Sequence, residues 1–265
     1  MSILLSNDDG ITSDGLAALR EALADLDEIW MVAPDRDQSA VSHALTLQRP
    51  LRIEPVGPRA FAVDGTPTDC VNLAINGILP ERPRLVVAGI NHGANLGDDI
   101  TYSGTVAAAL EGVVLGLPAI AVSQQSRAGA LDYRFDGGFG FEVAAAFVAG
   151  LVEQIEDVPL PRRSLLNINV PAAPPVGVEV TSLGTRIYRD ELKLESEEEH
   201  GRRYWIYGSD PGFHDVPGTD LAAVAAGRIA ITPIHFDLTD RPSIEALARF
   251  DLQALLDPAV REAMP

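Results

Sequence analysis

The sequence has almost no lysine or cysteine, and each shortage excludes a class of site. One lysine is present, Lys193, and it lies in an acidic stretch. P-loop, Schiff-base and kinase-type ATP sites each need a lysine in a Gly-rich or buried setting, which Lys193 does not have. Cys70 is the only cysteine. An intramolecular disulfide and a cysteine-rich metal site are therefore excluded as well.

Positive charge is scarce. Twenty Lys and Arg stand against 38 Asp and Glu in 265 residues, a net charge of −18. Such a surface repels nucleic-acid backbones and anionic membranes, so we expect neither as a partner. The longest apolar tract, residues 106–122, is interrupted by Glu111, two glycines and Pro118, which suits a helix followed by a strand. The first ten residues do not resemble a signal peptide. We therefore expect a cytoplasmic protein.

Short apolar runs alternate with helical periodicity along the first 170 residues. Residues 3–6 and 28–33 are typical of buried strands, and the leucines between them mark one face of a helix that Ser13 can cap. This β-α-β unit implies parallel strands with a right-handed crossover. The pattern continues with expected strands at 51–56, 60–63, 85–90, 119–123 and 165–170, and helices at 66–77, 105–115 and 140–154. We predict an α/β fold with a doubly wound, mostly parallel sheet.

The sequence pattern changes after Pro175. We divide the chain into a core, residues 1–175, and a C-terminal extension, residues 176–265, within one structural unit. The extension is expected to hold a strand at 178–183, arms at 186–194 and 203–207 around a solvated acidic loop, a helix at 219–226, a strand at 228–234 that returns to the core, and a terminal helix at 243–256. The aromatic second arm is costly to leave bare. We expect it to pack on another part of the protein or on a second subunit.

Polar segments follow three of the predicted strands. The carboxyl ends of parallel strands share one edge of a sheet, where ligands bind. In the first segment, Asp8 and Asp9 precede Gly10, which permits a sharp turn. Neighbouring carboxylates repel unless a cation neutralises them, and such oxygens suit Mg²⁺, Mn²⁺ or Ca²⁺. A plain turn into a helix is the alternative.

The other two segments are residues 34–43 and 89–105. Asn91, directly after a strand, can offer a carbonyl oxygen to a cation. Ser103, Gly104 and Thr105 open a helix and can present N–H groups and hydroxyls to an anion, or simply cap the helix. The glycines of this region do not form G-x-G-x-x-G, which disfavours a dinucleotide site.

In this order, the segments resemble the SurE (survival protein E) family. The matching stretches are ILLSNDDG (3–10), APDRDQS (33–39), GTPTDC (65–70), AGINHGANLGDDITYSGTVAAALEG (88–112), LNINVP (166–171) and ITPIHFDLT (231–239). The resemblance implies a Rossmann-like fold and a metal-dependent 5'/3'-nucleotidase that hydrolyses nucleoside monophosphates. It also implies homodimers or homotetramers that assemble through the C-terminal extension. One departure is Ala40, where many members have glycine.

The resemblance also assigns roles to residues. It implies one Mg²⁺ or Mn²⁺ ion per subunit, held by Asp8, Asp9, Ser39 and Asn91. Asn95 and the Ser103, Gly104 and Thr105 turn would lie where the phosphate docks. Asp8 or Asp9 would be catalytic, either by orienting a water molecule or by direct attack on phosphorus.

Two other functions stay open on the sequence. A haloacid-dehalogenase-like phosphatase also uses an aspartate after the first strand, but it needs D-x-D spacing and a later lysine, and neither is present. A non-enzymatic sensor would bind the metal and a nucleotide without turnover.

Overall fold

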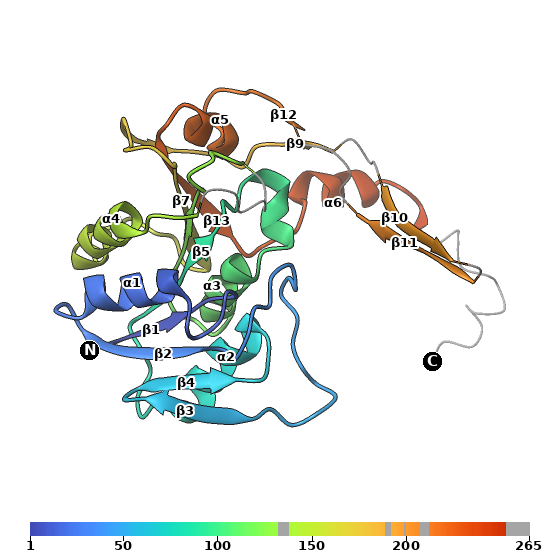
Figure 1. Cartoon of the computed structure of the whole chain (residues 1–265). Coiled ribbons are helices and arrows are strands. Elements are labelled where there is room, and N and C mark those ends of the chain that lie inside the picture. Colours follow the sequence, from blue (N-terminus) through green and yellow to red (C-terminus); the bar gives the residue numbers. More distant parts are fainter. Residues whose placement is uncertain (132–137, 189–191, 199, 207–211, 253–265) are drawn as a thin grey trace.

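A computed structural model describes residues 1–131, 138–188, 192–198, 200–206 and 212–252. Its main sheet has nine strands in the order β3-β4-β2-β1-β5-β6-β7-β13-β8 (Figure 1). The bounds are β1 (Ser2–Ser6), β2 (Glu28–Pro34), β3 (Ile53–Gly57), β4 (Ala60–Val63), β5 (Leu85–His92), β6 (Ala119–Gln124), β7 (Ser164–Val170), β8 (Val178–Val180) and β13 (Ile229–His235).

The predicted α/β architecture is confirmed. Strands β4, β2, β1, β5, β6 and β7 are parallel, while β3 and β13 run antiparallel to β4 and β7. The expected edge pair at 51–56 and 60–63 is the β3–β4 hairpin. From β1 the chain moves to β2 on one side and later returns as β5 on the other. The carboxyl ends of β1 and β5 therefore flank the switch point of the sheet, where ligands bind in open α/β folds.

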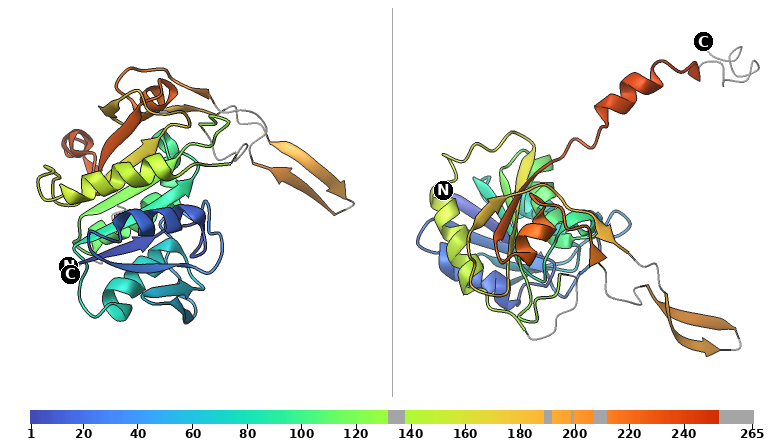
Figure 2. Two further views of the ribbon diagram at one scale, coloured as in Figure 1. Left: turned by 60° about the vertical axis from the view of Figure 1, so that its left-hand side comes forward. Right: turned by 90° about the horizontal axis from the view of Figure 1, so that it is seen from above.

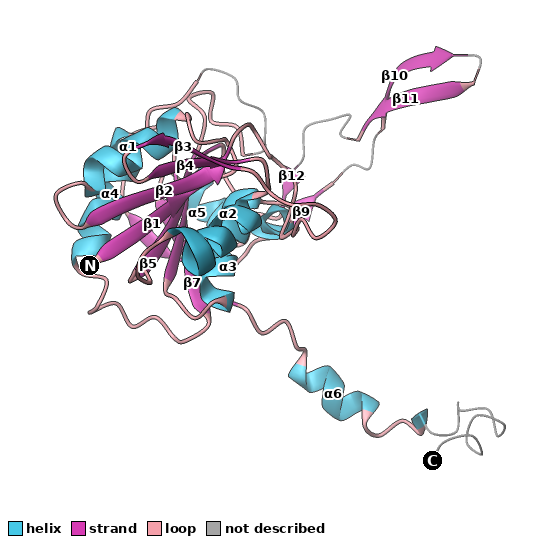
Figure 3. Ribbon diagram, turned by 90° about the horizontal axis from the view of Figure 1, so that it is seen from below, coloured by secondary structure: helices cyan, strands magenta, loops and turns pink. Residues whose placement is uncertain are grey.

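Helices cover both faces of the sheet (Figures 1 and 3). Helices α1 (Asp14–Leu23) and α4 (Glu142–Glu153) pack on one face, and α2 (Pro67–Leu73) and α3 (Gly104–Val114) on the other. A π-helical turn, η1 (Ala74–Ile78), continues α2. In α1 the leucines at 16, 19 and 23 are completely buried, as their spacing predicted. Each face thus has its own apolar core.

The C-terminal extension contributes to this sheet. Strand β13 pairs with β7 and β8, so two strands from beyond residue 175 extend the sheet of the core. The short helix α5 (Asp220–Ala225) lies beside them and begins at the Thr219 cap. A 3₁₀ turn, η2 (Gly97–Thr101), leads from the loop after β5 into α3.

The extension also forms two small two-stranded antiparallel sheets. Strand β9 (Arg186–Ile187) pairs with β12 (Gly212–Phe213), and β10 (Lys193–Glu198) pairs with β11 (Gly201–Trp205). The prediction of a solvated loop over the acidic run was wrong for residues 195–198, which form most of β10. These acids face arginines across the hairpin: Arg202 lies 2.5 Å from Glu197 and Arg203 lies 3.7 Å from Glu198. Such opposite-charge cross-strand pairs favour a strand.

The β10–β11 hairpin extends away from the body of the protein (Figure 2). Tyr204 and Trp205 on it are exposed, so the aromatic arm does not pack on the core of its own chain. Tyr207, the end of that arm, lies outside the described residues.

After β13 the chain leads away from the sheet and carries α6 (Arg241–Leu247) (Figure 3). This helix overlaps the start of the predicted terminal helix, whose last residues, 253–256, fall outside the described part of the chain. None of the described helices has the length and apolar character needed to cross a membrane.

Candidate active site

Asp8 and Asp9 lie on a tight turn at the carboxyl end of β1. The Asn7 side chain closes this turn, since its Nδ2 donates to the Gly10 carbonyl (3.1 Å) and its Oδ1 accepts the Gly10 N–H (3.2 Å). Gly10 has a φ of +100°, a backbone region that favours glycine. Asn7 also donates to the hydroxyl of Ser13, the N-cap of α1. The turn therefore fixes the two aspartates between β1 and α1.

Asp8 is buried against the start of α3. The Thr105 hydroxyl donates to its Oδ1, and Thr105 itself is completely buried. Burial, followed by the neighbouring charge of Asp9, raises the pKa of Asp8 to about 7. The ionised form of Asp8 is therefore costly in the protein alone.

Asp9 faces the end of β5. Its Oδ2 accepts the backbone N–H of His92 (3.2 Å), and its Oδ1 lies 3.3 Å from Nδ1 of the same histidine. Burial raises the pKa of Asp9 to about 7, and the charge of Asp37 adds to this, while the His92 N–H opposes it. No lysine or arginine among the described residues pairs with Asp8 or Asp9. This carboxylate pair therefore has the electrostatic character of a site built for a cation.

Two neutral oxygens come to the same edge of the sheet. The Asn91 amide nitrogen donates to the Gly93 carbonyl (2.8 Å), an assignment that leaves the Asn91 Oδ1 available as a ligand. The loop that carries Ser39 is bound to the β1 turn, because the Gln38 N–H donates to the Asp8 carbonyl (2.8 Å). The Ser39 hydroxyl donates to Asp37 Oδ1 (2.6 Å), so its oxygen lone pairs remain available to a cation.

Ala40, where the sequence departs from the resemblance, keeps a glycine-like backbone. Its φ is +58°. The left-handed region is where a glycine would be preferred, so the loop after Ser39 adopts a glycine-type conformation with an added methyl group.

The first turn of α3 closes the site. Ser103 is the N-cap, and its hydroxyl accepts the Val106 N–H (3.0 Å), as in the capping alternative. With the Thr105 hydroxyl on Asp8, both hydroxyls of this turn have partners inside the protein. The N–H groups of the first helical residues have no acceptor within a helix. Those of Gly104 and Thr105 are thus the groups of this turn best suited to an anion.

Asn95 lies further along the loop, over the carboxyl ends of β6 and β7. Its amide nitrogen donates to the Ser123 hydroxyl (2.8 Å), and its backbone binds the side chains of Asn167 and Asn169. Sequence reasoning missed these three residues and His92. The signal was present in LLNINV, because two asparagines spaced by two share one face of a strand that is otherwise apolar.

These residues define an oxygen-rich donor set. Among the described residues, no group of three or more His, Cys, Asp or Glu is arranged to hold a metal ion. The candidate site instead combines two carboxylates with hydroxyl and amide oxygens, the chemistry that Mg²⁺ and Mn²⁺ prefer.

The family model for survival protein SurE matches residues 3–190. The chain belongs to the SurE family. The 5'-nucleotidase SurE of Myxococcus xanthus is 52% identical over 250 residues, covering 93% of this chain and 92% of that protein. The 5'-nucleotidase SurE of Geobacter sulfurreducens is 48% identical over 257 residues, 96% of this chain and 95% of that one.

A solved structure supports the same assignment. The crystal structure of the SurE protein from Aquifex aeolicus superposes with a TM-score of 0.80 at 39% identity and covers 94% of this chain and 100% of that one. The fold and the family expected from the sequence are thus both confirmed.

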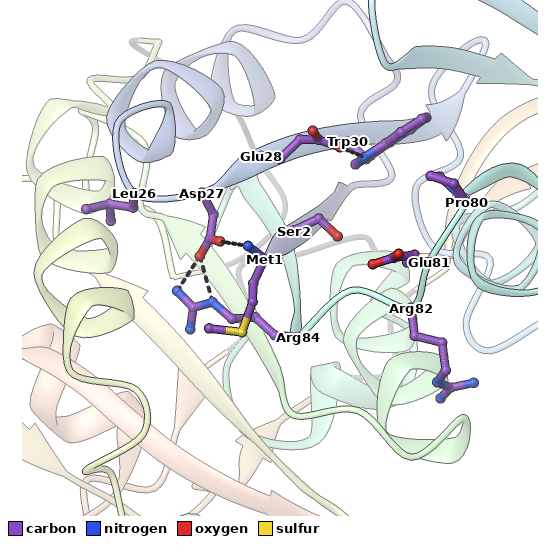
Figure 4. Close-up of a pocket in the computed structure, with 10 residues that line it drawn as sticks. All are labelled: Met1, Ser2, Leu26, Asp27, Glu28, Trp30, Pro80, Glu81, Arg82 and Arg84. Carbon is purple, nitrogen blue, oxygen red and sulfur yellow. Dashed lines mark hydrogen bonds and ion pairs between the residues drawn. The ribbon is translucent and has the colours of Figure 1, made fainter.

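A cavity of this SurE chain lies at the opposite edge of the sheet from the carboxylate pair (Figure 4). It has a volume of about 640 Å³ and opens beside the starts of β1 and β2. Its charged groups mostly bind one another: Asp27 pairs with the Met1 amino group (3.3 Å) and with Arg84 (2.6 Å), and the Trp30 indole donates to Glu28. These pairs leave few polar groups to bind a ligand, in contrast to the carboxyl edge.

Substitution of Gly104 by alanine adds one methyl group beside Asp8 and so tests the role of Asp8 in the site. A Cβ there would lie 2.7 Å from the Asp8 Cβ and 2.8 Å from its Oδ2, closer than real Cβ contacts allow. We expect Gly104→Ala to displace Asp8 and to weaken Mn²⁺ binding about tenfold or more. A loss of this size is typical when the groups that orient a metal ligand are disturbed. Isothermal titration with Mn²⁺ checks this. Gly150→Ala, in a helix where a Cβ meets nothing within 4 Å, is the matched control and should bind Mn²⁺ normally.

Proposed function

We propose that this chain is a divalent-metal-dependent phosphatase that hydrolyses nucleoside monophosphates to nucleoside and phosphate, a 5'/3'-nucleotidase. The observation that carries the proposal is the buried Asp8 and Asp9 pair at the switch point of the sheet, with the Asn91 and Ser39 segments beside it. Relatives of nearly equal length are named 5'-nucleotidases. Lys193 lies on the projecting strand β10, which disfavours a haloacid-dehalogenase-like mechanism.

The residues that would hold the ion are Asp8, Asp9, Ser39 and Asn91. When bound, one Mg²⁺ or Mn²⁺ per subunit would supply a Lewis acid that offsets the charge of the phosphate and lowers the pKa of water. A cation held in this way explains how a chain with a net charge of −18 accepts an anionic ester.

The protein's own groups have separate tasks. The Thr105 hydroxyl holds Asp8 and the His92 N–H holds Asp9, so both carboxylates are fixed before substrate arrives. The N–H groups of Gly104 and Thr105 and the dipole of α3 would stabilise the negative charge that develops on the phosphate oxygens. Asn95 and the Ser103, Gly104 and Thr105 turn would bind the phosphate. Asp8 or Asp9 would orient the attacking water or attack phosphorus directly.

The decisive experiment is phosphate release from AMP and GMP with Mn²⁺ and with EDTA. Release that requires Mn²⁺ supports the nucleotidase. Nucleotide and Mn²⁺ binding without release would instead identify a sensor, and release in EDTA would overturn the metal requirement.

The carboxylate pair predicts a pH-dependent stability. With folded-state pKa values of about 7 against 3.8 for the free side chain, the folded protein binds more protons than the unfolded chain between about pH 4 and pH 7. The free energy of unfolding therefore falls as pH rises through this window. Calorimetry on metal-free protein should show a lower Tm at pH 8 than at pH 5, and Mn²⁺ should raise Tm more at pH 8. An equal Mn²⁺ effect at both pH values would show that the buried carboxylates are not the cause.

We also infer that the protein is cytoplasmic and that it forms a homo-oligomer, a homodimer or homotetramer. The support for the oligomer is the projecting hairpin, on which Tyr204 and Trp205 are 45% and 60% exposed. Aromatic groups of this kind anchor protein interfaces. Sedimentation at micromolar concentration should give a mass above one subunit, and the double variant Tyr204→Ser, Trp205→Ser should reduce it. A wild-type monomer would refute this inference.

A further inference from the structure

Three side chains from the neighbouring strands β6 and β7 surround Asn95, a residue of the loop that follows β5. Ser123, Asn167 and Asn169 are all completely buried, and we refer to them as the asparagine clamp. Asn169 Oδ1 accepts the Asn95 N–H (2.8 Å), while Nδ2 of both Asn167 and Asn169 donates to the Asn95 carbonyl (2.9 Å each). Ser123 accepts the Asn95 amide (2.8 Å). The clamp thus binds the backbone N–H, the carbonyl and the side chain of a single residue.

The clamp is unfavourable to the sheet that contains it. Asparagine is depleted in strands, and a buried amide loses its hydration unless every polar atom finds a partner. Asn167 Oδ1 is buried without a hydrogen-bond partner. Apolar residues are the usual occupants of buried positions in parallel strands. Residues that break a local rule in this way commonly serve the functional site.

The loop held by the clamp directly follows Asn91, which lies near the end of β5, one residue beyond the strand expected at 85–90. Between Asn91 and Asn95, the Asn91 amide donates to the Gly93 carbonyl (2.8 Å) and the Gly93 N–H donates to the Gln124 carbonyl (3.0 Å). The His92 N–H donates to Asp9 (3.2 Å). The loop is therefore bound to the carboxylate turn at one end and to the clamp at the other. If the clamp no longer holds Asn95, the loop can move and the direction of the Asn91 Oδ1 is less restricted.

We propose that Asn169, assisted by Asn167 and Ser123, is a positioning residue for the metal and phosphate site. It acts through the backbone of Asn95 and fixes the loop so that Asn91 presents its oxygen beside Asp8 and Asp9. The proposal rests on the proposed function, because it assigns a role toward the ion inferred there. Outer partners of this kind, which orient a metal ligand, typically change metal affinity about 10- to 100-fold when they are removed.

The contacts predict graded effects. Asn169→Leu, close in shape, loses the acceptor for the Asn95 N–H and one donor to its carbonyl, so we expect Mn²⁺ to bind about tenfold more weakly. Asn167→Leu loses only one of two donors to the same carbonyl, and its effect should be smaller. Ser123→Ala frees the Asn95 side chain alone, so it should raise KM for AMP with little change in Mn²⁺ affinity.

A matched control lies in the same sheet. The hydroxyls of Thr181 and Thr232 bind each other at 2.7 Å and are buried between β8 and β13. The variant Thr181→Val removes this buried hydrogen bond, which does not touch the loop, and leaves Thr232, the residue opposite Asn167 on β13, unchanged. It should shift Tm while Mn²⁺ affinity and KM stay at wild-type values.

The experiment measures the Mn²⁺ Kd by electron paramagnetic resonance, Tm by calorimetry, and kcat and KM for AMP. If Asn169→Leu does not fold, the order of Asn167→Leu and Ser123→Ala still tests the proposal. Wild-type Mn²⁺ affinity in a folded Asn169→Leu, or an equal loss in the threonine control, would overturn the clamp alone. Wild-type protein that binds Mn²⁺ without releasing phosphate would overturn the nucleotidase and leave the clamp testable by Kd. Wild-type protein without Mn²⁺ binding would overturn both.

Discussion

Asp9→Asn is expected to reduce Mn²⁺-dependent phosphate release from AMP by about 10³-fold or more, equivalent to at least about 4 kcal/mol of transition-state stabilisation. The change is nearly isosteric, and the new amide oxygen can still accept the His92 N–H that Asp9 accepts at 3.2 Å. What disappears is one of the two negative charges that attract the cation. The loss should therefore fall on metal binding and turnover, with the fold intact.

The same variant should be more stable than wild type when metal is absent. Burial raises the pKa of Asp9 to about 7, so above this pH the wild-type protein carries a costly buried charge that asparagine lacks. We expect a higher metal-free Tm at pH 8 and a smaller increase on adding Mn²⁺. A gain in stability joined to a loss of activity is typical of a residue retained for function.

The control is Asp25→Asn, which removes an equal charge at an exposed position after α1. Its activity and its response to Mn²⁺ should match those of wild type. Turnover in Asp9→Asn close to that of wild type would show that Asp9 is not part of the reaction.

The features that could be predicted from the sequence are mostly local. The Asp8, Asp9 and Gly10 turn follows directly from a buried strand and a capped helix. The shared carboxyl edge of the polar segments follows from the strand alternation, because parallel strands end at the same edge of a sheet. The lengths of most core elements were also near the observed bounds, since hydrophobic periodicity reports burial.

The features that could not be predicted depend on residues far apart in the chain or on facing strands. The acidic run was expected to form a loop because its residues, taken alone, carry many like charges. It forms strand β10 because Arg202 and Arg203 on the neighbouring strand pair with its glutamates. The Ser103 cap was one of the two alternatives that the sequence left open, but the hydrogen bond from the Thr105 hydroxyl to Asp8 was not expected. Partners 97 residues apart, as Thr105 and Asp8 are, leave no trace in either segment alone.

Arg186 is the clearest residue of this second kind. From the sequence it only begins an arm of the extension, but in the structure its guanidinium is completely buried and pairs with Asp99 of η2 at 2.7 Å. Its backbone N–H donates to Asp98 (2.8 Å), and its side chain also donates to the Leu131 carbonyl. Because η2 leads into the Ser103 cap of α3, this one residue joins the extension to the wall of the active site.

Arg186→Met should therefore lower the free energy of unfolding by about 3–5 kcal/mol, as loss of one partner from a buried ion pair does. The cost arises from Asp99, whose carboxylate stays largely buried without its counter-charge. Urea unfolding followed by circular dichroism measures the change. Adding Asp99→Asn to Arg186→Met should recover part of the loss, because it removes the unpaired charge.

The control is the same substitution at an exposed pair. Arg228 lies 3.7 Å from Glu179, with side chains 46% and 34% exposed, so Arg228→Met should change stability by less than about 1 kcal/mol. At a temperature where Arg186→Met remains folded, its phosphate release should still be lower than that of Arg228→Met, since η2 no longer holds α3 in register with Asp8. Equal unfolding midpoints for the two variants would mean that the Arg186 contacts with η2 add nothing to stability. Equal turnover would mean that these contacts do not affect the catalytic site.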